Sequence, residues 1–159
     1  MSTDHRNGLL ELMRSVRAEL DALVAGLDGK LDAIPGNNPN WRMHDVLFHI
    51  ALWERMAARK IAGTPLPDGE DLANREPWDM DAFNNAMQAR WRDRSAGDVL
   101  TELAAAHTAL VTAVEGADDE ECAPGGSAWT AIAEDSAGHY PAHFPLTDLF
   151  AEDLNQQPD

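Results

Sequence analysis

The chain has few cysteines, few basic residues and no long apolar segment, and each shortage excludes a class of protein. Cys122 is the only cysteine among 159 residues, so no disulfide can form within the chain, which suits a reducing cytoplasm. The first residues lack a basic stretch followed by an apolar core, so we expect no signal peptide. No apolar run approaches the roughly 20 residues that span a bilayer. These features predict a cytoplasmic protein without a membrane partner.

Positive charge is also scarce. Lysine and arginine total 12 against 28 aspartate and glutamate residues, which gives a formal net charge of −16. This charge repels nucleic-acid phosphates and anionic membrane surfaces, so we exclude both as main partners. The apolar content of 44% is normal for a globular protein. A chain of this length fits one domain with a substantial core better than two, and we expect a single domain over residues 1–159.

No segment shows the sustained alternation of a strand, and the apolar residues instead recur every three or four positions. This spacing is typical of amphipathic helices. The helical patterns begin near Leu9, after a plausible N-cap at Asn40, near Asp79 or Asp81, and near Trp129. The last pattern continues through residues 139 and 143 to 150. The sequence therefore predicts an all-α fold, an antiparallel four-helix bundle.

Three sites interrupt the helical patterns. Gly63 is a natural end for the second helix. Residues 63–80 hold three prolines without periodicity, and so long a loop in a compact domain either forms a wall of a site or is a permissive surface connection. Residues 95–98 read Ser-Ala-Gly-Asp, a capping sequence at which the third helix breaks or kinks.

Three histidines lie on the apolar faces of the second and last predicted helices. His139 and His143 are four apart, a spacing that stacks two side chains on one helix face, and His49 is on the other helix. Zinc and similar ions bind imidazole nitrogen, and catalytic sites commonly use three protein ligands with one open position. The alternative is that all three are hydrogen-bonded core histidines. His107 is a rival ligand on an apolar stripe, whereas His44 and His5 look exposed.

Pro141 lies between the two paired histidines and argues against an unbroken helix there. Proline removes a backbone donor and should clash with the carbonyl group of Ala137. A kink would preserve the ligand pair, whereas a clean break would threaten it.

Other catalytic patterns are missing. There is no His-Glu-x-x-His motif, and Glu54 follows His49 at a spacing that points it away from the ligand stripe. The carboxylates beside Cys122 should disfavour its thiolate, so we regard this cysteine as incidental. The sequence also lacks a phosphate-binding glycine loop and a serine nucleophile elbow.

Several short motifs together carry a family resemblance over roughly residues 9–150. They are Trp41, Asp45-Val46-Leu47-x-His49-Ile50-x-x-Trp53-Glu54, Phe83-Asn84, Arg92-Asp93-Arg94-Ser95, Trp129-Thr130 and His139-Tyr140-Pro141-Ala142-His143. In these motifs the chain resembles the DinB/YfiT-like superfamily, and within it the ClbS/DfsB-type four-helix proteins. The resemblance implies a four-helix bundle whose divalent metal ligands match His49, His139 and His143. The chain departs from the pattern at Arg42, where a small hydroxyl residue is expected, and at Trp91, where a polar residue is expected.

The resemblance also implies a class of chemistry. The superfamily includes metal-dependent transferases and isomerases that use low-molecular-weight thiols, and detoxifying hydrolases. We therefore expect a metal-dependent enzyme that acts on small reactive electrophiles, by thiol transfer or by hydrolysis with activated water. The metal would be zinc, nickel or iron. Five side chains could wall the pocket: Trp53, Phe83, Asn84, Trp91 and Tyr140.

Two other functional classes remain open from the sequence. One is a bundle that binds or sequesters a small molecule without turnover, and the other is a purely structural bundle. The oligomeric state is equally open, a homodimer included.

Overall fold

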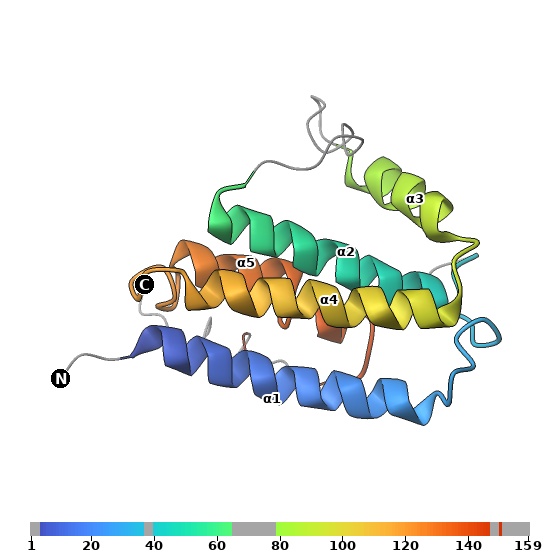
Figure 1. Cartoon of the computed structure of the whole chain (residues 1–159), viewed down its shortest axis with the longest axis horizontal. Coiled ribbons are helices and arrows are strands. Elements are labelled where there is room, and N and C mark those ends of the chain that lie inside the picture. Colours follow the sequence, from blue (N-terminus) through green and yellow to red (C-terminus); the bar gives the residue numbers. More distant parts are fainter. Residues whose placement is uncertain (1–3, 37–39, 65–78, 147–149, 151–159) are drawn as a thin grey trace.

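The computed structural model describes residues 4–36, 40–64, 79–146 and 150, and within these ranges the chain is helical and contains no strand (Figure 1). The helices are α1 (His5–Gly26), α2 (Met43–Ala62), α3 (Met80–Trp91), α4 (Ala96–Glu115), α5 (Ser127–Asp135) and a short 3-10 helix, η2 (Tyr140–Ala142). The all-α prediction is confirmed. None of the described helices is long and apolar enough to cross a membrane.

Helix α2 is the centre of the packing. It contacts α4 most extensively and also packs against α5 and α3, while α1 packs on α4. Most residues of α2 are buried, whereas α1 buries one stripe, Leu9, Met13, Val16 and Leu20. Burial of each such side chain contributes about 1.5–3 kcal/mol. A residue of α2 can therefore face any of several neighbouring helices, depending on its position.

The helices alternate in direction along the chain. In Figure 1, α1, α3 and α5 run from left to right, and α2 and α4 run from right to left. The short helix α3 thus returns the chain, so that α2 and α4 lie side by side and run in the same direction.

The start of α2 differs from the prediction. Asn40 is not its N-cap but lies two residues earlier in a left-handed turn with φ of 68°. Arg42 is the N-cap residue, and its backbone N–H donates to the Asp45 carboxylate at 2.8 Å. The guanidinium group of Arg42 also pairs with this carboxylate. The Asp45 carboxylate therefore secures the first turn by accepting from the Arg42 backbone N–H, and its negative charge is favourable near the N-terminus of the helix.

Three other predicted boundaries match the structure. Gly63 ends α2 in the left-handed conformation, with φ of 68°. The carboxylate of Asp79 caps α3. Ser95 and Asp98 form a capping box at the start of α4, and the chain breaks into two helices there instead of kinking. The predicted loop over residues 63–80 lies mostly outside the described residues.

Candidate metal centre

The three candidate ligands come from two parts of the fold. His49 lies on α2 with 7% of its surface exposed. His139 and His143 are the residues that flank η2 at its two ends. The prediction of one helix running from Trp129 through both histidines is wrong, because α5 ends at Asp135. The pair is presented by a loop that contains η2, which we call the ligand loop (residues 136–143).

The residues that follow Asp135 explain why helix α5 ends there. Ser136 leaves helical geometry, with φ of −132° and ψ of −115°. A Cβ atom at Gly138 would lie 2.0 Å from the carbonyl oxygen of Ala133, so the close return of the chain requires glycine. Pro141 is tolerated within the first turn of η2, where its missing N–H costs nothing. The clean break keeps the pair of histidines together.

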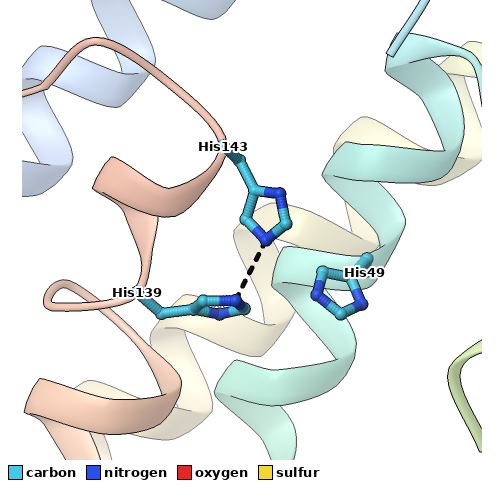
Figure 2. Close-up of side chains that lie close together, drawn as sticks. All are labelled: His49, His139 and His143. Atoms are coloured by element: carbon cyan, nitrogen blue, oxygen red, sulfur yellow. Dashed lines mark hydrogen bonds between the residues drawn. The ribbon is translucent and has the colours of Figure 1, made fainter. Parts of the chain in front are cut away.

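The three imidazole rings turn toward a common point, as Figure 2 shows. The ring centroid of His49 lies 5.3 Å from that of His139 and 5.0 Å from that of His143. The Nε2 atoms of His139 and His143 are 3.0 Å apart. Each residue offers one ring nitrogen, and these nitrogens all lie within 4.8 Å of one another.

This arrangement fits a divalent metal ion. Imidazole nitrogens bind tetrahedral zinc at about 2.0–2.1 Å, which places two ligand nitrogens roughly 3.3 Å apart. The separation of 3.0 Å between His139 and His143 is close to this value, and the 4.8 Å limit leaves His49 only a small movement to make. Zinc, nickel and iron all accept such a ligand set. Three nitrogens leave coordination positions open for a further molecule.

Burial keeps the three imidazoles in the form that binds metals. Desolvation lowers the pKa of His49 to about 3, and the neighbouring His139 and His143 add to the shift. Burial and the proximity of His139 lower the pKa of His143 to about 4. Burial also lowers the pKa of His139. All three rings are therefore neutral at pH 7, with a lone pair available.

Aromatic side chains surround His49. The indole rings of Trp41 and Trp53 approach its imidazole edge-on, with centroid distances of 5.5 Å and 6.2 Å. Trp53 also donates its Nε1–H to the side-chain oxygen of Asn84 at 3.0 Å, and Phe83 packs against it at 6.1 Å. This links α3 to the site. Trp41, a half-buried residue, was not among the predicted pocket residues.

The other two predicted pocket residues, Trp91 and Tyr140, lie in different surroundings. Trp91 stacks on Phe48 with ring centroids 4.5 Å apart, and the guanidinium group of Arg94 lies over the Trp91 ring, 5.2 Å from its centroid. Phe83 and Tyr140 are both 0% exposed. The side chain of Tyr140 belongs to a polar cluster in the core, described below.

The other histidines are not part of the site. His107 bonds to the buried carboxylate of Glu54, with Nδ1 3.3 Å from Oε1, as expected of a satisfied core histidine. The expectation of an exposed His44 is wrong, because this residue is fully buried and its Nε2 lies 2.7 Å from the carbonyl oxygen of Arg94. His5 is half-buried. Cys122 is buried, and burial together with Asp119 raises the pKa of its thiol, as expected of an unreactive cysteine.

Glu54 is the residue that the sequence interpretation missed. It is 0% exposed, and its carboxylate accepts hydrogen bonds from Arg17, Ser136 and Tyr140 as well as contacting His107. The sequence did carry a signal for this cluster. Glu54 lies among the apolar positions of α2, and Arg17 interrupts the apolar stripe of α1. Two opposite charges on buried stripes are each other's natural partners.

The chain was compared with protein families, curated proteins and solved structures. The family model described as the mycothiol maleylpyruvate isomerase N-terminal domain matches residues 13–143. Neither a curated protein nor a solved structure matches the chain. The matched family is a DinB/YfiT-like four-helix domain family, which confirms the superfamily resemblance. Because the match spans most of the chain and includes all three histidines, this protein belongs to the mycothiol maleylpyruvate isomerase N-terminal domain family.

Proposed function

We propose that this protein binds a divalent metal ion through His49, His139 and His143 and uses it against small reactive electrophiles. The observation that carries the proposal is the convergence of three neutral imidazoles, one from α2 and two from the ligand loop. A bound ion of this kind would lower the pKa of a thiol or a water molecule and supply a nucleophile at neutral pH.

The protein's own residues contribute position and exclusion of water. The three imidazoles fix where the nucleophile would stand, and Trp41 and Trp53 give that position an apolar flank. Apolar surroundings strengthen electrostatic effects and exclude competing water. Asn84, held by Trp53, offers an amide group at the same flank for a polar part of a substrate.

The family name supports a thiol as the second reactant, since the matched model is named for a mycothiol-dependent isomerase. In thiol transfer, the sulfur forms a bond to the electrophilic carbon, the leaving group departs with the bonding electrons, and the thiol proton passes to solvent. Hydrolysis follows the same course with a water oxygen in place of sulfur. The proposed product is a less reactive compound, as in detoxification.

Metal analysis of the purified protein tests the ligand set. We expect a single zinc or nickel ion per chain after equilibration at micromolar metal. We expect His143→Ala to lose this ion, because only two of the three imidazole ligands remain. The control is His5→Ala, which removes a histidine at the start of α1 and should leave the metal content unchanged. A wild-type protein without stoichiometric metal would contradict the proposal.

A turnover assay separates an enzyme from a protein that only binds. The metal-loaded protein is incubated with electrophiles and either mycothiol, another low-molecular-weight thiol, or no thiol. We expect product formation that depends on His143. A compound that raises the melting temperature but is never consumed would instead indicate a sequestering protein.

A further inference from the structure

The carboxylate of Glu54 gathers polar groups from four parts of the fold. Its Oε1 accepts from the hydroxyl groups of Ser136, at 3.0 Å, and Tyr140, and lies 3.3 Å from Nδ1 of His107. Its Oε2 accepts from Nη1 of Arg17 at 3.2 Å. The groups come from α1, α4 and both halves of the ligand loop. A carboxylate buried this completely is tolerated only because its oxygens are so well satisfied.

The two hydroxyl residues in this cluster are also the ones that hold the backbone of the two histidines. The carbonyl oxygen of Ser136 accepts from the backbone N–H of His139 at 2.7 Å. The carbonyl oxygen of Tyr140 accepts from the backbone N–H of His143 at 3.0 Å. One oxygen of Glu54 therefore fixes the side chains of two residues, and the main chain of each fixes one candidate metal ligand.

Within the part of the chain that the structure describes, two of the three candidate ligands lack the usual hydrogen bond to the second ring nitrogen. Metal-binding histidines normally donate their second ring nitrogen to a carboxylate or carbonyl group, which sets the ring orientation. Among the described residues, Nδ1 of His143 is buried and has no hydrogen-bond partner, and the same holds for Nδ1 of His49. The orientation of His143 must therefore come from the loop that carries it.

Helix α2 relates all three ligands to one another. It carries His49 and, five residues later, Glu54, which lies about 7.5 Å further along a rigid helix. His49 faces the site directly, whereas Glu54 reaches the ligand loop from the core. The same element thus supplies one ligand and anchors the other two.

We propose that Glu54 is a positioning residue, a buried anion that holds the ligand loop through Ser136 and Tyr140 and so keeps His139 and His143 in place for the metal. This role rests on the proposed metal site. It differs from that of a general base, because the carboxylate lies in the core and contacts the loop instead of a reactant.

Cobalt(II) binding tests this role, because its visible absorption reports coordination geometry. We compare the wild type with Tyr140→Phe, which removes one hydroxyl group, and with Glu54→Gln, which removes the charge at constant shape. Loss of a residue that supports a metal ligand by hydrogen bonding typically weakens metal binding by about 10–100-fold. We expect a loss of this size in both variants, together with an altered cobalt spectrum.

A matched control separates positioning from general destabilisation. Leu20→Ala creates a cavity under α1, a helix that carries no candidate ligand. It should lower the melting temperature of the metal-free protein at least as far as Tyr140→Phe does, yet leave cobalt affinity and the cobalt spectrum unchanged. Equal losses of affinity in Leu20→Ala and Tyr140→Phe would overturn the role of Glu54.

Amide hydrogen exchange of the metal-free protein provides a readout that needs no metal. We expect the amides of His139 and His143 to exchange faster in Tyr140→Phe and Glu54→Gln than in the wild type. The exchange rates of the α4 amides should be unchanged in Tyr140→Phe. Wild-type protein that binds no cobalt would overturn the proposed function and this role with it. Normal cobalt binding and unchanged exchange in both variants would overturn only the role of Glu54.

Discussion

Burial has opposite consequences for the two kinds of titratable side chain near the metal centre. The imidazoles have no ion partner, so burial lowers the pKa of His49 and His143 and keeps the rings neutral. Burial alone would raise the pKa of Glu54, but the hydrogen bond from His107 and the charge of Arg17 outweigh it and hold that pKa below its usual value. Neutral ligands and a permanent anion therefore exist within one small region.

The lowered histidine pKa values predict a loss of stability in mild acid for the metal-free protein. The unfolded histidines take up protons near pH 6.5, whereas the folded ones resist until about pH 4 for His143 and about pH 3 for His49. The stabilising effect is complete above pH 6.5 and is lost as the pH falls. Between pH 7.5 and 5, protonation of each of these two residues should lower the free energy of unfolding by about 2 kcal/mol.

Urea denaturation at several pH values between 7.5 and 5 measures this loss. His143→Ala removes one titrating group, so its stability should depend on pH less steeply than that of the wild type. In the folded protein the carboxyl group of Glu54 stays charged over this range, because its pKa is lowered from 4.5. A free energy of unfolding that stays constant from pH 6.5 to 5 would show that the imidazoles are not buried as described.

The candidate metal ligands could be predicted from the sequence better than the surroundings of individual side chains. The apolar stripe of α2 was enough to suggest His49, because a histidine there must be buried. The burial of His44 was not predicted, since its partner, the carbonyl group of Arg94, lies fifty positions away in the chain. The partners of Glu54 are similarly distant. Contacts between residues so far apart in the sequence depend on how the helices pack, and apolar periodicity does not encode that packing.

At the scale of elements, the short segment after α5 matters more than any single helix. Helical spacing suggested that His139 and His143 share a face, and they do lie together, but across a 3-10 helix outside α5. A 3-10 turn and a regular helix both bring residues three or four apart to one side. The spacing therefore indicated proximity although the predicted element was wrong.

Two glycine substitutions should have opposite effects on stability. Gly138→Ala places a Cβ atom against the Ala133 backbone and should lower the free energy of unfolding by about 1–3 kcal/mol. Gly8→Ala lies within α1 with nothing within 4 Å, so it should raise stability by about 0.5–1 kcal/mol. Urea denaturation of the metal-free variants measures both.

Zinc affinity gives the second readout for the same pair. A shifted ligand loop should weaken zinc binding in Gly138→Ala, whereas Gly8→Ala should bind as the wild type does. An unchanged affinity in Gly138→Ala would mean that the close return of the chain after α5 is not needed to place the histidines.

On the scale of the whole molecule, the site depends on the way α2 is enclosed. Its neighbours α3, α4 and α5 pack on it, and the ligand loop after α5 brings His139 and His143 close to His49. The helical class could be predicted from apolar periodicity alone. The course of the chain could not, because the parallel arrangement of α2 and α4 depends on the short return through α3 (Figure 1).

The most direct measurement of the central claim is the anomalous diffraction of zinc-loaded crystals. The account predicts one zinc peak at about 2.0–2.1 Å from a ring nitrogen of each of His49, His139 and His143, with room for a further ligand. A zinc ion held by other residues, or by a set that omits one of these histidines, would contradict it.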